Sequence, residues 1–213
     1  MRYLSILFST AFALLLTTNI NASDEIETSY SELPKKDVKG LLHMVEEEKL
    51  ARDVYLKLYK KWKMPIFNKI SQSEQRHMDA VRSLLKKYSI DDPTNSTEQG
   101  KFVSEELQKL YKQLVNKGCT SEQDALMVGA TIEDLDINDL NKLIAESKNE
   151  AVKLVYTRIN NGSMNHMRAF SNELKKLKAT YIPQFISLKV YEDIISKPIN
   201  KCDKKPKCSD CSK

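Results

Sequence analysis

The stretch Ser73-Glu-Gln-Arg-His-Met78 places a glutamate and a histidine three residues apart, at positions 74 and 77. Apolar residues recur around it at helical spacing: Phe67, Ile70, Val81, Leu84, Leu85 and Tyr88. This spacing predicts an amphipathic helix that carries Glu74 and His77 on its buried stripe. Because burial of a carboxylate or an imidazole without partners costs several kcal/mol, both side chains need a partner in the core, and a metal ion is one that serves both.

Helical periodicity extends over most of the chain. We predict long helices over 37–62, 65–88, 120–147 and 150–178, and shorter helices over 103–115 and 185–195. The last long helix is predicted to loosen locally at Asn160-Asn-Gly-Ser163. Because no strand alternation is present, the predicted fold is all-α: a four-helix bundle with a long crossover that carries a short extra helix, followed by a short C-terminal helix.

Composition supports this class and argues against nucleic-acid binding. Glycine and proline are scarce, with five and six of 213 residues, as expected of long helices. The formal net charge is +5, but six lysines lie from Lys197 onward, and Arg2 belongs to the N-terminal segment. The remaining body is close to neutral, so we expect no basic face for nucleic acid.

The N-terminal segment has the features of an export signal. Arg2 precedes an apolar run from Leu4 to Leu16, and the small residue Ala22 suits a cleavage site. The run is shorter than the roughly 20 residues that span a membrane. We therefore predict a periplasmic or secreted protein with no membrane contact after cleavage, the alternative being an uncleaved N-terminal anchor. The expected parts are a signal peptide over 1–22, an exposed lead-in over 23–36, the helical domain over 37–197 and a flexible Lys/Cys-rich tail over 198–213.

The first helix offers a candidate metal ligand in the run Glu46-Glu-Glu48. Its apolar stripe places position 48 at the centre, position 47 at the margin and position 46 outside. Glu48 is therefore the inward carboxylate. The alternative is a buried ion pair between Glu48 and Arg52, one turn further on.

The helix over 120–147 offers a pair of acids. Glu133 and Asp136 lie three residues apart on its apolar side. The alternative is a solvated acidic turn, because Asp134 and Asp139 lie close by and runs of like charge are usually exposed.

The last long helix offers His166, which shares a stripe with Ile159 and Phe170. A single histidine on an apolar face is more often a satisfied core residue than a ligand. However, an acid, a Glu-x-x-His pair, two acids and a histidine now occur in order on four successive long helices. Two cations would explain several buried carboxylates that would otherwise repel one another.

Four motifs carry these residues, and they occur in this order: Glu46-Glu-Glu-Lys-Leu-Ala-Arg-Asp-Val-Tyr55, Ser73-Glu-Gln-Arg-His-Met-Asp-Ala80, Val128-Gly-Ala-Thr-Ile-Glu-Asp-Leu-Asp-Ile137 and Gly162-Ser-Met-Asn-His-Met-Arg-Ala-Phe170. Together they closely resemble an uncharacterised ferritin-like family catalogued as domain of unknown function 2202, over residues 41–195. That family is similar to rubrerythrin, a di-iron peroxidase. The first ligand glutamate of rubrerythrin is followed by Ala, Arg and Tyr at the offsets of Ala51, Arg52 and Tyr55 from Glu48.

The resemblance implies a ferritin-like bundle that holds two metal ions, either iron or iron with manganese. It assigns terminal-ligand roles to Glu48 and Glu133, a bridging role to Glu74, and one nitrogen ligand per metal to His77 and His166. It further implies that a small-molecule oxidant, peroxide or dioxygen, reacts with the reduced metals and that an unknown electron donor restores them. The homodimer remains an open alternative to the monomer.

The sequence departs from the ferritin-like pattern on the last long helix. Ser163 stands where a second Glu-x-x-His would have its glutamate, so one bridging carboxylate is missing. Asp136 is the candidate that compensates, because rubrerythrin also places two acids one turn apart on its third helix. Without compensation, the site would hold one metal, or two unequally.

Two neighbours of the site have roles that the sequence leaves open. Arg52 is expected either to orient Glu48 or to serve structure alone. Tyr55 is expected either near the metals, as a proton or electron relay, or in a structural role. Three methionines flank the two candidate histidines: Met78, Met164 and Met167. Methionine in a core usually fills gaps, but in an exported protein histidine together with methionine makes copper an alternative metal.

The cysteines do not form the electron-transfer module of rubrerythrin. Its rubredoxin module has two Cys-x-x-Cys pairs, whereas this chain has Cys119, Cys202 and the single pair Cys208-Ser-Asp-Cys211. The tail cysteines are predicted to form a disulfide or to bind a soft metal. Because the usual electron donor is missing, a non-catalytic metal carrier or a structural bundle is the alternative to an oxidoreductase.

His43 lies off the main apolar stripe of the first helix and is assigned to the surface.

Overall fold

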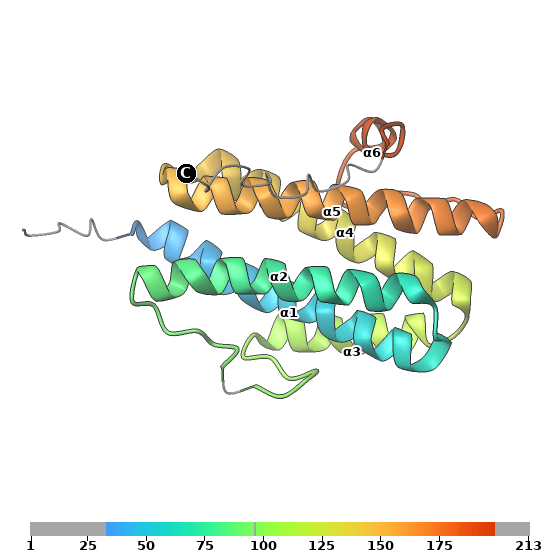
Figure 1. The fold of residues 1–213 in the computed structure, drawn as a ribbon, viewed down its shortest axis with the longest axis horizontal. Helices are drawn as coiled ribbons and strands as arrows, with labels where there is room; N and C mark the ends of the chain where they lie inside the picture. Colours follow the sequence, from blue (N-terminus) through green and yellow to red (C-terminus); the bar gives the residue numbers. More distant parts are fainter. Residues whose placement is uncertain (1–32, 96, 199–213) are drawn as a thin grey trace, which may run out of the picture. The chain divides into compact units, whose positions relative to one another are not determined.

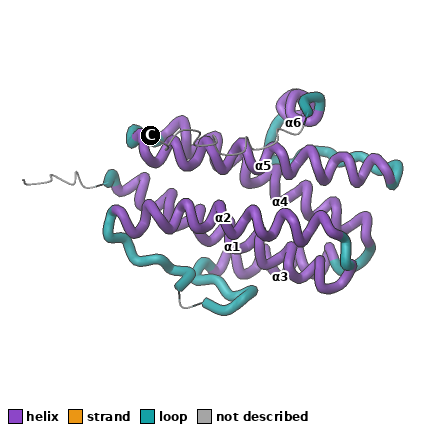
Figure 2. The backbone as a smooth tube through the Cα atoms, viewed as in Figure 1, coloured by secondary structure: helices purple, strands orange, loops and turns teal. Residues whose placement is uncertain are grey.

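The computed structural model describes residues 33–95 and 97–198, and this part of the chain contains six α-helices and no strand (Figure 1, Figure 2). The helices are α1 (Lys35–Trp62), α2 (Pro65–Lys87), α3 (Glu105–Gly118), α4 (Glu122–Glu146), α5 (Glu150–Lys176) and α6 (Leu188–Ile195). The predicted all-α class is confirmed.

Some predictions concern residues outside those described. These are the signal peptide over 1–22, the lead-in up to residue 32 and the tail from residue 199, with Cys202, Cys208 and Cys211. The fourth cysteine, Cys119, is a partly buried free thiol. Among the helices of residues 33–95 and 97–198, none has both the length and the apolar composition needed to cross a membrane.

Side-chain caps fix where several helices begin. Ser104, Ser121 and Asn149 each accept hydrogen bonds from backbone N–H groups in the first turn of α3, α4 and α5. These N–H groups have no partner within the helix, so the caps stabilise the helix starts. Pro65 begins α2, where its missing N–H has no consequence. The observed starts of these helices lie within a few residues of the starts predicted from periodicity.

The predicted loosening at residues 160–163 is wrong, because α5 is continuous through them. Gly162 serves another purpose there. A Cβ atom at this position would lie 2.5 Å from Nε2 of His77, so the glycine makes room for an α2 side chain against the α5 backbone.

The four long helices pack in two pairs. α1 packs along α2, and α4 packs along α5; α1 also contacts α4, and α2 contacts α5 (Figure 1). The shorter helices lie outside these pairs: α3 contacts α1 and α4, and α6 contacts α5. Residues far apart in the sequence therefore face one another between the two pairs.

Buried charges hold the connection between α2 and α3 against α1. The Glu46 carboxylate accepts a hydrogen bond of 2.6 Å from the backbone N–H of Val103. Asp53 accepts one of 2.8 Å from the N–H of Gly100 and pairs with Lys49 at 2.7 Å. Glu46, predicted to lie outside the buried stripe, is therefore buried, because the connection covers a face of α1 that periodicity assigns to solvent.

The apolar core consists of two clusters with a polar layer between them. The first includes the tilted ring contacts among Tyr55, Phe67 and Phe170, and the second surrounds Tyr156. On each long helix, the candidate ligands lie between residues of the two clusters along the chain; Glu48, for example, follows Val45 and precedes Ala51. Apolar side chains thus enclose the charged layer on both sides.

Candidate metal centre

Six charged side chains from the four long helices converge in the polar layer and are named here the central cluster: Glu48, Glu74, His77, Glu133, Asp136 and His166. The four carboxylates are at most 6% exposed. The histidine side chains are 12% exposed at His77 and 11% at His166. The fold thus brings all six candidate ligands from the sequence together, five of them buried and His77 partly buried.

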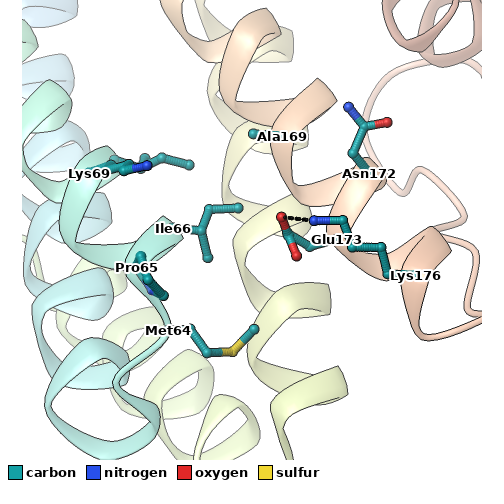
Figure 3. Close-up of a pocket in the computed structure, with 9 residues that line it drawn as sticks. Met64, Pro65, Ile66, Lys69, Ala169, Asn172, Glu173 and Lys176 are labelled. Atoms are coloured by element: carbon teal, nitrogen blue, oxygen red, sulfur yellow. Dashed lines mark hydrogen bonds and ion pairs between the residues drawn. The ribbon is translucent and has the colours of Figure 1, made fainter.

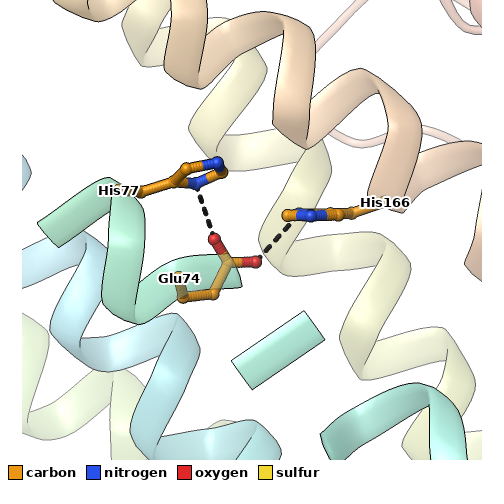
Figure 4. Close-up of side chains that lie close together, drawn as sticks. All are labelled: Glu74, His77 and His166. Atoms are coloured by element: carbon orange, nitrogen blue, oxygen red, sulfur yellow. Dashed lines mark ion pairs between the residues drawn. The ribbon is translucent and has the colours of Figure 1, made fainter. Parts of the chain in front are cut away.

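Glu74 lies between His77 and His166 (Figure 4). Its two oxygens approach different histidines: Oε2 lies 2.8 Å from Nδ1 of His77, and Oε1 lies 2.9 Å from Nδ1 of His166. Glu48 Oε2 lies 3.3 Å from Nδ1 of His77, and Glu133 Oε2 lies 3.4 Å from Nδ1 of His166. Each histidine nitrogen therefore faces one acid of its own and one oxygen of the shared Glu74.

These short contacts do not have the alignment of hydrogen bonds. Nδ1 of both histidines, Oε1 of Glu48, Oε1 of Glu74 and Oδ1 of Asp136 are buried and have no hydrogen-bond partner. Folded proteins rarely leave buried polar atoms unpaired. Ligand atoms about 2.1 Å from one ion and about 90° apart would lie about 3.0 Å from each other without pointing at each other. The donor set therefore fits metal ions placed between these atoms.

Burial and mutual charge shift the acid–base equilibria of the cluster. Burial raises the pKa of Glu48 to about 8, although His77 opposes this shift. Burial would also raise the pKa of Glu74, but His166 and His77 hold it well below its ordinary value. Burial would lower the pKa of His77, yet Glu48 and Glu74 raise it to about 10. Protons thus occupy donor atoms in the metal-free cluster, and they must leave when a metal binds.

The charge of the deprotonated cluster matches two divalent cations. Four carboxylates and two neutral imidazoles carry four negative charges. Without cations this charge is strongly unfavourable in the core: burial raises the pKa of Asp136 well above its ordinary value, and nearby Glu48 and Glu47 raise it further.

Asp136 and Ser163 meet directly. The Ser163 hydroxyl donates a hydrogen bond to Oδ2 of Asp136, while Oδ1 of Asp136 has no hydrogen-bond partner. The small serine on α5 therefore leaves space for a carboxylate that comes from α4. This arrangement supports the compensating role considered for Asp136.

The two neighbours expected beside the ligands behave differently. The Tyr55 hydroxyl donates a hydrogen bond of 2.6 Å to Oε1 of Glu133, so Tyr55 adjoins the central cluster. Arg52 instead bonds to Asp53 and Gln75, at 2.7 Å and 2.6 Å. Of the roles considered for Arg52, these contacts therefore favour the structural one over an ion pair with Glu48 or an orienting contact to it.

The alternative of a solvated acidic turn on α4 is also wrong. Glu133, Asp134 and Asp136 are all buried. Asp134 faces away from the central cluster and accepts hydrogen bonds from the Tyr181 hydroxyl, at 2.7 Å, and from the backbone N–H of Ile186, at 2.9 Å. It thereby ties the segment before α6 to α4.

The three methionines considered as copper ligands belong to the apolar clusters or pack against them: Met78, Met164 and Met167.

Sequence reasoning missed a second group of donors, named here the outer cluster: His43, Glu47 and Asp139. Nε2 of His43 lies 3.1 Å from Oε2 of Glu47 and 3.7 Å from Oδ2 of Asp139. The side chain of His43 is 42% exposed, in keeping with its surface assignment, whereas Glu47 is buried. The spacing of His43 and Glu47, four residues apart on one helix, is the signal that could have revealed the pair.

Two cavities differ sharply in character. A small one, with room for about one water-sized sphere, is lined by acids of both clusters and the apolar Ala51 and Ile132. An open groove of about 700 Å³ lies between the start of α2 and the end of α5 and is lined by Met64, Ile66 and Glu173, among others (Figure 3). The groove contains no residue of the central cluster, so the buried acids are the chemically distinctive site.

The chain is similar to known proteins over nearly all of its predicted helical domain. The family model described as "Uncharacterized protein domain (DUF2202)" matches residues 37–198. The uncharacterized protein MJ0754 of Methanocaldococcus jannaschii is 54% identical over 171 residues, which cover 78% of this chain and 92% of the relative. The crystal structure of hypothetical protein MJ0754 is similar with a TM-score of 0.76 and 55% identity, over 76% of this chain and 93% of that chain.

Proposed function

We propose that this chain, which belongs to the DUF2202 family of uncharacterized domains, is an exported ferritin-like protein. It would bind two metal ions, with iron as the metal, and act as an oxidoreductase on peroxide or dioxygen. One observation carries the proposal. Four buried carboxylates, the buried His166 and the partly buried His77 converge from four helices, and several of their ligand atoms have no hydrogen-bond partner. A helical protein without metal would not be expected to retain such a layer in its core.

The arrangement of the helices supports the ferritin-like part of the proposal. The pairs α1–α2 and α4–α5 face one another, and the chain crosses from one pair to the other through a long connection that contains α3. Di-metal bundles of this type project their ligands inward from all four helices. The central cluster has the same origin, with ligands from α1, α2, α4 and α5.

The contacts divide the central cluster into two halves that share Glu74. Glu48 and His77 form one half, and Glu133 and His166 form the other. Each half contacts a different oxygen of Glu74, which supports a bridging role for this residue. Asp136 lines the same small cavity as Glu48, Glu74 and Glu133 and would supply the further carboxylate.

The chain's own side chains would control the surroundings of the metals. A bound iron pair supplies reversible electron transfer to a small oxidant. The carboxylates favour the higher oxidation state, and the two apolar clusters limit the entry of water. Burial and the neighbouring Glu133 raise the pKa of Tyr55 well above its ordinary value, so its hydroxyl keeps its proton and holds Glu133 in place.

Metal analysis of anaerobically purified protein tests the proposal. We expect two tightly held iron ions per chain and rapid oxidation by peroxide, seen as growth of an absorbance band near the ultraviolet edge. The variants His77→Ala and His166→Ala should each weaken metal binding by at least about 100-fold, since even partners outside the ligand shell contribute 10–100-fold. Full iron binding in both variants would contradict the ligand assignment.

A non-catalytic metal carrier is the second candidate function. The serine at position 163 and the single Cys-x-x-Cys pair favour it, because both depart from the rubrerythrin pattern. The same experiment separates the candidates: a carrier would bind iron, manganese or copper without rapid oxidation by peroxide. A bundle with a purely structural charge layer would show a melting temperature that chelators leave unchanged.

A further inference from the structure

The outer cluster joins two helices at the edge of the polar layer. His43 and Glu47 lie one turn apart on α1, and Asp139 comes from α4. One oxygen of Asp139, Oδ1, accepts hydrogen bonds from Lys142 at 2.9 Å and Asn138 at 2.8 Å. The other oxygen, Oδ2, faces Nε2 of His43. One imidazole nitrogen and two carboxylate oxygens therefore approach a common point.

Glu47 is the observation that points to a ligand. It is 2% exposed, and neither of its carboxylate oxygens has a hydrogen-bond partner. Its Oε2 lies 3.1 Å from Nε2 of His43, but the two atoms do not have hydrogen-bond alignment. Such a carboxylate is strongly unfavourable unless a positive charge balances it, and either a protonated His43 or a metal ion between the two side chains would supply that charge.

We propose that His43, Glu47 and Asp139 form a second, outer site that binds one divalent transition-metal ion. Two carboxylates and a neutral imidazole carry two negative charges, which one divalent ion neutralises. The imidazole nitrogen selects zinc, iron or cobalt over calcium, whose ligands are oxygens alone. The partial exposure of His43 gives the ion access from solvent, and water would complete its coordination.

The outer site shares no residue with the proposed iron centre, although both sites adjoin one cavity and Glu47 acts electrostatically on Asp136. Glu47 lines the small cavity together with Glu48, Glu133 and Asp136. No residue of the outer cluster is a ligand in the proposed iron centre. Occupancy of the two sites can therefore be measured separately.

Titration of the metal-stripped full-length protein with Co²⁺ tests the proposal, with calorimetry for stoichiometry and visible absorption for nitrogen coordination. His43→Ala should bind one ion fewer per chain than the wild type, or bind that ion at least about 100-fold more weakly. Glu47→Gln should have the same effect while preserving the shape of the side chain. Because His43 also contacts the buried Glu47 at 3.1 Å, metal-free His43→Ala should melt at a lower temperature than the wild type, and circular dichroism confirms its fold before the titration.

Two controls separate this site from the central cluster and from surface charge. Lys142→Ala removes a neighbouring cation but no candidate ligand, so it should keep the outer ion. His166→Ala should lose binding at the central cluster and keep the outer ion. If the iron centre does not exist, the wild type and His166→Ala would both bind one ion, and His43→Ala none. Equal stoichiometry and affinity in the wild type, His43→Ala and Glu47→Gln would overturn the proposal.

Discussion

At the scale of single residues, Asp136 and Ser163 determine how many carboxylates the central cluster has. Asp136 comes from α4, one turn after Glu133, and its contact with Ser163 places it beside α5. One of its oxygens accepts from serine, and the other has no hydrogen-bond partner. If this free oxygen is a metal ligand, the position of the carboxylate should matter more than the helix that supplies it.

Exchange of the two residues tests this idea. Asp136→Ala should reduce bound iron from two ions per chain toward one, because the cluster loses one of four negative charges. The double variant Asp136→Ala/Ser163→Glu returns a carboxylate to the same space from α5 and should recover the second ion. Iron content per chain after gel filtration measures both effects. A double variant that binds no more iron than Asp136→Ala would show that Asp136 does not compensate for Ser163.

The burial of residues on the most apolar stripe of each helix could be predicted from sequence, but the burial of residues on the other faces of α1 could not. Glu48, Glu74 and His166 were identifiable because spacing places them among apolar neighbours. Glu46 and Glu47 are equally buried, yet their burial depends on partners elsewhere in the chain. α1 is covered by α2, α3, α4 and the connection before α3, so a rule that assumes one buried stripe underestimates its buried surface.

At the scale of helices, Gly162 shows that a helix can be predicted correctly while the role of a residue within it is not. The spacing of apolar residues predicted the helix over 150–178, and α5 runs from Glu150 to Lys176. The glycine suggested a weak point because glycine lowers helix stability by about 1 kcal/mol relative to alanine. Its actual role, room for His77, depends on how α2 and α5 pack and has no local signature in the sequence.

Gly162→Ala should therefore strengthen the helix and weaken the site. The added Cβ would lie 2.5 Å from Nε2 and 2.7 Å from Cε1 of His77, so the ring must move. We expect unchanged helical content by circular dichroism and weaker iron binding, by about 10-fold or more, since small displacements of ligands affect affinity strongly. Asn161→Ala, at the exposed neighbouring position, is the matched control. Equal iron affinity in both variants would argue against His77 as a ligand.

At the scale of the whole molecule, buried acids and histidines make folding stability depend on pH. Burial raises the pKa of Glu48 from 4.5 to about 8, so the metal-free fold favours its protonated form. The carboxylates Glu48 and Glu74 raise the pKa of His77 from 6.5 to about 10 against the effect of burial. Both shifts stabilise the metal-free fold at low pH, and both contributions are lost as pH rises through these values. The lowered pKa of Glu74 acts in the opposite direction, but only below about pH 5.

The metal-free and metal-loaded proteins should therefore respond to pH in opposite directions. Between pH 5 and pH 9 the melting temperature in chelator should fall, because the folded state must give up protons that it holds more tightly than the unfolded chain does. In saturating metal, the stabilisation should grow over the same range, because fewer protons compete for the ligand atoms and the ion binds only the folded state. Differential scanning calorimetry at pH 5, 7 and 9 measures both curves. Curves that run parallel would mean that the metal does not bind at the titrating acids and histidines, whatever the total metal content.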